Sequence, residues 1–399
     1  MIPSTADRNE IFMERLQQLR RFMSRELLDA LFVYGDEYRK ENLRYVSNYW
    51  PLFERGAAVI GLTAEPIVLC APEGQKVCEE MSVWNDIRVV PDFLCVTVPD
   101  TIAYPMAQYT SFSAIAGELG FTKGKKRLGV VGLDAMPMAL VQTIETAFQA
   151  ELVDANGILH ALRCTKSPYE IACLARAAQI ADTAYKKLLS SDIIGMTEIQ
   201  AAGIIEAAAR HEGAEHIIFN VFASGARTAT IIGRPTSKII ENGDMIMCAL
   251  AVQYEGYVAT CEAPFAVGDY SDQTRRVIDV LIRASAQGLP YLKPDEPMKN
   301  FVRAVKKVFY EEGLEQYDIY PPLHGIGCAE AESPYPNENS EETFQIGMTV
   351  NTDISLFGLE GGSNRIEEGF VITESGAKSL SPFVRDYCEK WLERRLARR

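Results

Sequence analysis

One short segment divides this chain more sharply than any other feature of its sequence. In LRCTKSPYEIACLARAAQIADTAYKKLL, Ser167 suits an N-cap, Pro168 suits the first helical position and Glu170 completes a capping box, so a long helix is expected to begin here. The whole chain has 399 residues, which is too long for one compact core. We therefore expect two domains, residues 1–160 and residues 161–399.

The first domain reads as alternating helices and strands. A charged amphipathic helix is expected around residues 8–28 and another helix around residues 137–149. Apolar runs typical of buried strands lie among them: LDALFVYG, AAVIGL, PIVLC, IRVVP and KRLGVVGLD. This alternation predicts an α/β domain with a mixed or parallel sheet.

The second domain reads differently. A second capping box, Thr197 to Gln200, opens a helix, and two more helices are expected over residues 271–288 and 297–312. Long strand-like runs follow each pair of helices, which predicts an α+β domain with helices on one side of a curved antiparallel sheet. Because each half runs helix, helix, strands, the pattern suggests an internal pseudo-repeat.

Charge and composition exclude some classes of function. The chain carries 40 basic and 54 acidic residues, a net charge of −14, which argues against broad contact with nucleic acid but leaves room for a local basic pocket. The charged N-terminal sequence does not resemble a signal peptide, and no run approaches the ~20 apolar residues of a membrane span. The nine cysteines show no CxxC spacing. We expect reduced thiols and a cytoplasmic protein.

Several segments, in order along the chain, resemble the creatinase/aminopeptidase P/methionine aminopeptidase family. They are LDALFVYGDEYRKENLRYVSNYW, LRCTKSPYEI, GDMIMCALAVQYEGYVATCEAPFAVGD, LHGIGCAEAESP, GMTVNTDIS and NRIEEGFVITESG. The resemblance implies an α/β N-terminal domain followed by a C-terminal domain with the α+β "pita-bread" fold.

The peptidases of that family bind two divalent ions through two Asp, one His and two Glu. Here the two Asp positions fall on Ala249 and Thr260, the His on His324, and the two Glu on Asp353 and Glu367. Hard cations need several carboxylate oxygens, so the resemblance argues against a two-metal centre. A single-metal site of His324, Asp353 and Glu367 stays open as an alternative.

The accessory histidines of the peptidases are missing as well. Ala331 stands at one such position and is followed by Glu332, and the loop FASGARTATIIGRPT contains no histidine. This pattern argues against proline-peptide cleavage in the usual way. Glu332 and, within that loop, Arg227 are candidate substrate contacts.

The resemblance to creatinase, a metal-free member of the family, suggests what replaces the metal site. Glu262 falls where creatinase has a glutamate that binds the substrate guanidinium, two residues beyond Thr260 and therefore on the same strand face. Arg55 falls on the arginine that binds the substrate carboxylate from the partner subunit. His324 would then act as a general acid and base near neutral pH.

Other residues near these positions have simpler interpretations. A Cys–His pair of Cys328 and His324 would allow covalent catalysis, but inert buried thiols are commoner, and Cys261 should point away from Glu262. Arg365 is expected to be a structural ion-pair partner, because its neighbour Glu367 is the expected pocket residue.

Together these features give a hypothesis about function. We expect a creatinase-like, metal-independent hydrolase of a C–N bond in a small zwitterionic, amidine or guanidino metabolite, with no cofactor and with a homodimeric, shared active site. The predicted catalytic residues are His324, Glu262 and Glu367, and the predicted substrate contacts are Arg55, Asp353, Glu332 and Arg227. Two alternatives stay open: an inactive pseudo-peptidase that binds peptides or proteins, and a single-metal hydrolase or lyase.

Overall fold

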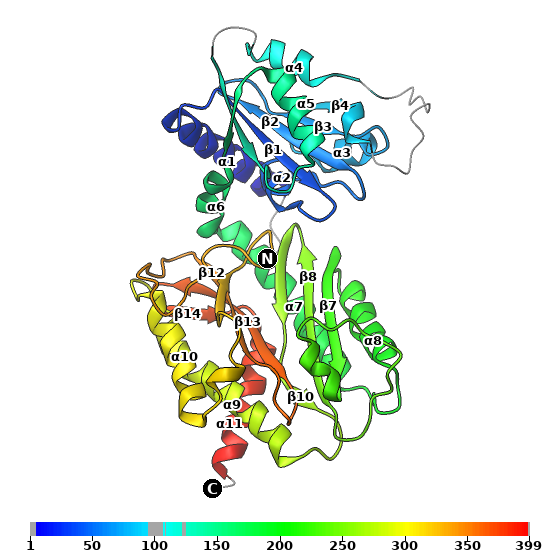
Figure 1. The fold of residues 1–399 in the computed structure, drawn as a ribbon, viewed down its shortest axis with the longest axis vertical. Coiled ribbons are helices and arrows are strands. Elements are labelled where there is room, and N and C mark those ends of the chain that lie inside the picture. The colour runs from blue at the N-terminus through cyan, green and yellow to red at the C-terminus, as the bar shows by residue number, and fades with distance from the viewer. Residues whose placement is uncertain (1–4, 95–106, 108, 122–124, 398–399) are drawn as a thin grey trace. The chain divides into compact units, whose positions relative to one another are not determined.

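The computed structural model describes residues 5–94, 107, 109–121 and 125–397. The chain forms two compact units, of which the first ends at Arg163 and the second begins at Cys164. Both units combine helices with sheets (Figure 1). The expected classes, α/β for the first and α+β for the second, are confirmed.

The N-terminal unit contains one six-stranded sheet in the order β4-β3-β2-β1-β5-β6. The β1–β2 and β2–β3 pairs are antiparallel and the other three are parallel, so the sheet is mixed. Its elements are α1 (Thr5–Arg25), β1 (Ala30–Asp36), α2 (Glu41–Ser47), β2 (Arg55–Gly61), β3 (Ile67–Cys70), α3 (Gln75–Met81), β4 (Asp86–Val89), η1 (Pro91–Phe93), α4 (Phe112–Glu118), β5 (Arg127–Val131), α5 (Met138–Phe148), β6 (Glu151–Asp154) and α6 (Asn156–Cys164).

One face of this sheet packs against α4 and α5. Alternate residues of β1, such as Phe32, point to this face because side chains alternate along a strand. Phe32 meets Phe112 of α4 edge to face, with ring centroids 5.9 Å apart, and Phe121 meets Phe148 of α5 in the same way at 5.1 Å. The core of this unit is therefore built by the period-two pattern of the strands.

The C-terminal unit contains two four-stranded sheets. The first has the order β10-β8-β7, with β9 also paired to β8, and the second has the order β11-β12-β13-β14. Its elements are α7 (Pro168–Leu189), α8 (Glu198–His211), β7 (His216–Ser224), η2 (Gly225–Thr230), β8 (Met245–Tyr254), β9 (Tyr257–Cys261), β10 (Phe265–Ala266), α9 (Asp272–Gly288), η3 (Leu289–Tyr291), α10 (Met298–Glu312), η4 (Glu315–Tyr317), β11 (Leu323–Gly325), β12 (Thr349–Leu356), β13 (Asn364–Thr373), β14 (Gly376–Ser379) and α11 (Pro382–Ala397).

Each half of this unit runs helix, helix and then four strands, in the order that the sequence suggests. In the first half α7 and α8 contact β7, β8 and β9, and in the second half α9 contacts β12 and β13. The two sheets meet where Glu262, directly after β9, forms a backbone bridge with Glu367 of β13. The bridge consists of two hydrogen bonds, Glu262 N to Glu367 O at 3.1 Å and Glu367 N to Glu262 O at 3.0 Å. This seam brings two sequence-distant glutamates together.

Both predicted capping boxes are present. Ser167 N donates to Glu170 Oε2 at 2.8 Å, and Thr197 N donates to Gln200 Oε1 at 2.9 Å. Directly before α7, buried Lys166 pairs with Glu332 at 2.7 Å. The segment that opens the second unit is thus fixed both by its cap and by a buried ion pair.

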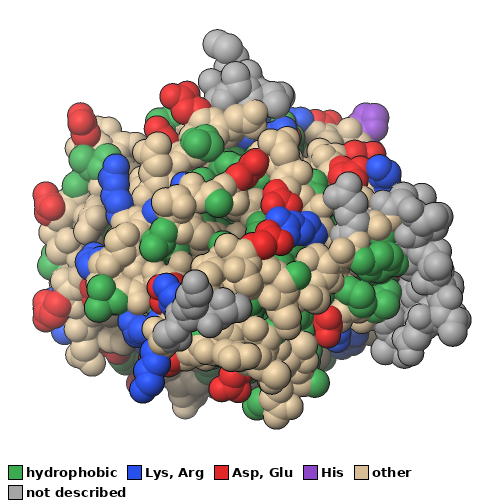
Figure 2. All heavy atoms as spheres, turned by 90° about the horizontal axis from the view of Figure 1, so that it is seen from above, with side chains coloured by type: hydrophobic (Ala, Val, Ile, Leu, Met, Phe, Trp, Pro, Cys, Tyr) green, Lys and Arg blue, Asp and Glu red, His purple; other side chains and the backbone are tan. Residues whose placement is uncertain are grey.

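Surface and thiol chemistry agree with the composition. Among the helices that the structure describes, none has the length and apolar character needed to cross a bilayer. On the face drawn in Figure 2, acidic and basic side chains are interspersed rather than segregated by sign. The cysteines in the described ranges are free thiols, while Cys95 lies outside those ranges.

Glu54, in the N-terminal unit, gives a testable pH dependence. Burial and then the negative charge of Glu73 raise its pKa to about 7, although a hydrogen bond from the Gly74 backbone lowers it. Because the pKa of Glu54 is higher in the folded state than in the unfolded state, the protonated carboxyl favours folding. This contribution to the free energy of unfolding is fully present below the unfolded pKa near 4.5 and is lost as the pH rises through 7.

We expect Glu54→Gln to leave stability unchanged at pH 4 and to raise the free energy of unfolding by about 1–2 kcal/mol at pH 8. Urea titrations at both pH values check this. A Trp391→Phe background restricts tryptophan fluorescence to Trp50 and Trp84 of the N-terminal unit, because the chain has three tryptophans. An equal effect at both pH values would contradict the assignment.

Candidate active site

A cavity of about 620 Å³ lies in the C-terminal unit. Polar and charged residues line one part of it: Asn220, Arg234, His324, Glu330, Asp353, Arg365 and Glu367. Apolar and aromatic residues line the rest, among them Phe219, Val221, Tyr320, Leu323 and Tyr335. Convergent polar groups within an apolar cavity are typical of a small-molecule site.

Strand register brings the acidic residues together. Asp353 of β12 lies directly opposite Glu367 of β13, and Arg365 shares the face of Glu367 because it is two residues away. The backbone bridge at the seam adds Glu262 beside Glu367. Extending the β8–β9 register by one residue beyond Leu250 and Cys261 also places Glu262 opposite Ala249, where the resemblance predicts an Asp.

A tight turn after β11 adds a fourth carboxylate, that of Glu330. Gly325 pairs with Glu332 across this turn, with Glu332 N donating to Gly325 O at 2.9 Å. The turn needs glycine, because a Cβ on Gly325 would lie 2.2 Å from Ser333 O and one on Gly327 would lie 2.4 Å from Glu332 Oε1. The turn directs Glu330 towards Thr260, whose Oγ1 donates to Glu330 Oε1 at 3.4 Å. Glu330 thus supplies a carboxylate beside the position of the second lost Asp.

The tautomer of His324 follows from its contacts. Its Nδ1 lies 2.9 Å from Gly325 O, and a carbonyl oxygen only accepts hydrogen bonds, so Nδ1 carries a proton. In the neutral ring Nε2 then has a free lone pair, and it lies 3.7 Å from Glu330 Oε1. A histidine fixed through a backbone carbonyl in this way is the usual arrangement of a metal-binding imidazole.

Arg365 is the main positive charge among these acids. Its Nε lies 3.3 Å from Glu262 Oε2, while its Nη1 lies 3.7 Å from Asp353 Oδ2 and 3.5 Å from Glu367 Oε1. Nη2 donates to Ile231 O at 2.6 Å, which ties the guanidinium to the loop after η2. Burial lowers the pKa of Arg365, but Glu262, Asp353 and Glu367 outweigh that effect and raise it.

We call Glu262, Glu330, Asp353 and Glu367 the acidic cluster. Burial raises the pKa of Glu262 to about 8, against the lowering effect of Arg365, and Asp353 raises it further. Burial is also the largest cause of the raised pKa values of Glu330, Asp353 and Glu367. One guanidinium therefore does not neutralise three buried carboxylates and the partly exposed one of Glu330, and the cluster favours either protonation or a further cation.

Three groups in the cavity meet the requirements for binding one divalent cation. His324, Glu330 and Glu367 each offer a ligand atom, and these atoms all lie within 4.8 Å of one another. One imidazole with two carboxylates is a donor set that suits zinc, manganese or iron. A second cation would compete with the Arg365 guanidinium for Glu262, Asp353 and Glu367. The residues present thus fit a one-metal centre.

The structure brings together some of the predicted site residues. His324, Asp353 and Glu367 line the cavity, and buried Glu262 contacts Arg365. Arg365 forms ion pairs, as the sequence suggests, and Glu367 is one of its partners, but it also lines the cavity. These residues form the centre of the site.

The other predicted contacts lie elsewhere. Glu332 does not line the cavity, because its carboxylate pairs with Lys166. Arg227 does not line it either; it pairs with buried Glu198 and donates to Arg234 O. Arg55 begins β2 of the N-terminal unit, where it interacts with Tyr34.

Sequence reasoning missed Glu330. The predicted single-metal set used Asp353, whereas the structure groups His324 and Glu367 with Glu330. The sequence analysis considered the missing histidine at Ala331 but not Glu330, the carboxylate directly before it. The two glycines of LHGIGCAEAESP were the sequence signal that could have indicated a tight turn at this position. In the structure both are closely packed, as the turn requires.

The thiols give no sign of catalysis. Cys261 is buried, and its pKa is raised well above the ordinary value, chiefly by burial. Cys328 is buried too and does not line the cavity. Neither of these two thiols therefore supports a covalent mechanism.

Comparison with known proteins identifies the family of this chain. Residues 172–374 match the model of metallopeptidase family M24, and residues 15–165 match the creatinase/prolidase N-terminal domain. The chain belongs to family M24. The resemblance and the two-domain fold inferred from the sequence are therefore confirmed.

Individual relatives agree with this assignment. An Xaa-Pro dipeptidase of Pyrococcus furiosus is 25% identical over 94% of this chain and 99% of its own length. An uncharacterised peptidase of Bacillus subtilis is 32% identical over 58% of this chain and 66% of its own length. The crystal structure of a prolidase from Pyrococcus horikoshii has a TM-score of 0.78 and 21% identity, and covers 92% of this chain and 98% of that one.

These findings correct the functional hypothesis. The prediction of a metal-independent, creatinase-like hydrolase is wrong, because the family is one of metallopeptidases and His324, Glu330 and Glu367 form a possible metal site. The coarser expectation of a hydrolase is confirmed. The cause of the error lies in the fold: Glu330 restores a carboxylate that the strand positions had lost.

The donor set predicts a metal stoichiometry. We expect the protein to bind one Mn²⁺ or Zn²⁺ per chain, measured by calorimetry and elemental analysis. Glu330→Gln and His324→Gln should each weaken binding at least about 100-fold, since a neutral amide or a lost imidazole is a poorer ligand. Glu360→Gln, at an exposed position, is the control. Binding of two ions per chain, or unchanged affinity in both variants, would contradict the assignment.

Proposed function

We propose that this protein is a metal-dependent dipeptidase that acts on Xaa-Pro dipeptides. The observation that carries the proposal is the grouping of His324, Glu330 and Glu367 in one cavity of a chain from a metallopeptidase family. The match to an Xaa-Pro dipeptidase over 94% of this chain supports the substrate class. The accessory histidines are missing, so other residues must hold the substrate.

Different residues of the cavity would bind the metal ion and position its ligands. His324, Glu330 and Glu367 would hold one divalent cation, which supplies a Lewis acid for the peptide carbonyl and lowers the pKa of a bound water. Arg365 fixes Asp353 and Glu367 by ion pairing, while Glu262 acts as a positioning residue through Arg365. His324 presents Nε2 because its Nδ1–H is held by Gly325 O.

The rest of the cavity supports a small, partly apolar substrate. Phe219, Tyr320 and Tyr335 line it and offer ring surfaces to an apolar group such as the proline ring. Arg234 also lines the cavity, is exposed, and has no acidic partner among the residues that the structure describes. A guanidinium in that position suits the C-terminal carboxylate of a dipeptide.

The loop that carries Arg234 is fixed by a buried carboxylate. Glu198 Oε1 accepts from Ser224 N at 2.8 Å and from Ser224 Oγ at 2.9 Å. Glu198 Oε2 accepts from Thr236 N at 3.0 Å and pairs with Arg227. Arg227 Nη2 in turn donates to Arg234 O at 3.1 Å. Arg227 therefore contributes by positioning the backbone of Arg234.

The homodimer remains part of the proposal, with Arg55 reaching the active site of a partner chain. Arg55 belongs to the N-terminal unit, whereas the residues of the metal-binding group belong to the C-terminal unit. Light scattering of the purified protein tests the oligomeric state, and it is independent of the metal chemistry proposed above.

The activity itself is the first test. We expect the Mn²⁺-loaded protein to hydrolyse Ala-Pro, EDTA to abolish turnover and added Mn²⁺ to restore it, with proline release measured by chromatography. Glu330→Gln should lower kcat/KM at least about 100-fold, because it weakens metal binding. Glu360→Gln should retain activity. Failure of the loaded protein to hydrolyse any Xaa-Pro dipeptide would refute the proposal.

The role of Arg234 has a matched test. Arg234→Gln should raise KM for Ala-Pro about tenfold or more with a smaller change in kcat, because a charge-assisted hydrogen bond to the carboxylate is lost. The wild type should prefer Ala-Pro to Ala-Pro amide, and the variant should lose that preference. Arg303→Gln, at an exposed position on α10, is the control. An unchanged preference for the free acid in Arg234→Gln would exclude this role.

A further inference from the structure

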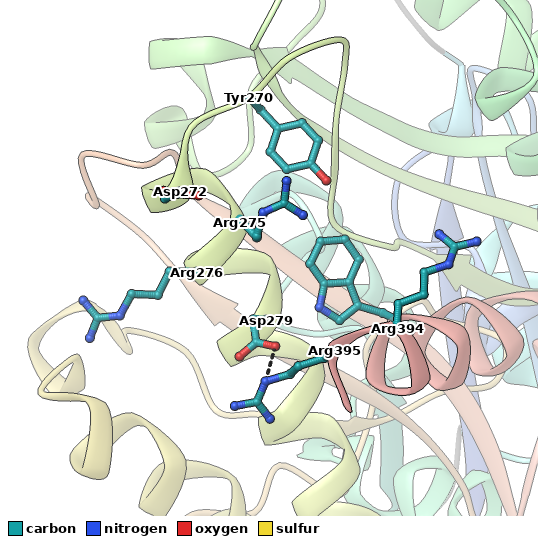
Figure 3. A pocket seen from close by; sticks show the side chains of 8 residues that line it. Tyr270, Asp272, Arg275, Arg276, Asp279, Arg394 and Arg395 are labelled. Carbon is teal, nitrogen blue, oxygen red and sulfur yellow. Dashed lines mark ion pairs between the residues drawn. The ribbon is translucent and has the colours of Figure 1, made fainter. Parts of the chain in front are cut away.

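A second cavity, of about 450 Å³, lies between α9 and α11 (Figure 3). It shares no lining residue with the candidate active site. Two helical stripes form it together with the tyrosine that precedes α9: Tyr270, then Asp272, Arg275, Arg276 and Asp279 from α9, then Trp391, Arg394 and Arg395 from α11. The spacing i, i+3, i+4 places each set on one helix face.

The lining carries more positive than negative charge, although the whole chain carries −14. Four arginines face two aspartates. Both carboxylate oxygens of Asp279 are engaged in ion pairs. Oδ1 pairs with Arg395 at 2.9 Å and Oδ2 pairs with Arg283 at 2.9 Å. Arg276 pairs with Glu312 at 3.1 Å. These pairs fix part of the lining and leave the remaining arginines for a ligand.

Arg275 and Arg394 have no acidic partner among the residues that the structure describes. The guanidinium carbon of Arg275 lies 4.9 Å from the ring centroid of Tyr270. In Figure 3 the Arg275 side chain lies beside that of Tyr270. The lining thus offers the guanidinium groups of Arg275 and Arg394 together with the indole ring of Trp391.

We propose that this cavity binds a small anion that carries a planar ring, with the chemistry of a nucleoside monophosphate. Guanidinium groups bind phosphate oxygens in pairs of parallel hydrogen bonds. The indole of Trp391 offers a flat surface for a base, because base–aromatic stacking tolerates any base. A volume of about 450 Å³ falls in the range of small-ligand sites.

Titration of the full-length protein with AMP, adenosine and inorganic phosphate tests this proposal. We expect calorimetry to show AMP binding, with adenosine and phosphate each at least tenfold weaker, because each offers only half of the recognised chemistry. AMP should quench tryptophan fluorescence, and Trp391→Phe should abolish the quenching, because Trp391 is the tryptophan that lines the cavity.

Variants locate the site. Arg275→Gln and Arg394→Gln should each weaken AMP binding at least fivefold, whereas Arg303→Gln, an exposed arginine outside the cavity, should not. Circular dichroism and metal content confirm that the variants fold. Absent AMP binding, equal affinity for phosphate and AMP, or equal weakening by Arg303→Gln would each overturn the proposal. None of these outcomes depends on the dipeptidase activity.

Discussion

The ion pairs of Arg365 link the two sheets of the C-terminal unit. Its guanidinium contacts Glu262 from the end of one sheet and Asp353 and Glu367 from the other, at the seam where a short backbone bridge joins the two sheets. The Arg365 side chain is 7% exposed and that of Glu262 is fully buried, so water screens these charges little. Removing one partner of such a buried pair typically costs about 3–5 kcal/mol, since the others are left uncompensated.

The acidic cluster has more negative charge than Arg365 balances, and this surplus makes the site suited to a cation. Two strand positions expected to carry Asp have Ala249 and Thr260 instead, yet carboxylates return to both places from other segments. Glu262 stands opposite Ala249 and serves the guanidinium, while Glu330 reaches Thr260 from a turn and joins His324 and Glu367. The site thus contains one fixed positive charge, the Arg365 guanidinium, and a ligand set that suits one divalent metal ion.

Much of the fold was readable from local patterns. The capping boxes at Ser167 and Thr197 depend on residues three apart, so sequence alone locates the starts of α7 and α8. The strands of the site were equally visible, and the structure places Arg365 and Glu367, two residues apart on β13, on one face. Roles that depend on distant partners were not visible. Arg227 and Glu332 were expected to contact substrate, but Glu198 and Lys166 bind them.

The sequence by itself determined the order of helices and strands, the two kinds of domain and the family, because these depend on short-range periodicity and on motifs. It also determined that His324, Asp353 and Glu367 would converge. Only the tertiary structure decided which carboxylates accompany His324, because that depends on a turn whose glycines let Glu332 pack against Gly325 and so direct Glu330 inwards. The two strand positions Ala249 and Thr260 do lack the expected Asp ligands. The fold supplies a carboxylate in place of one of them, because the turn brings Glu330 next to Thr260.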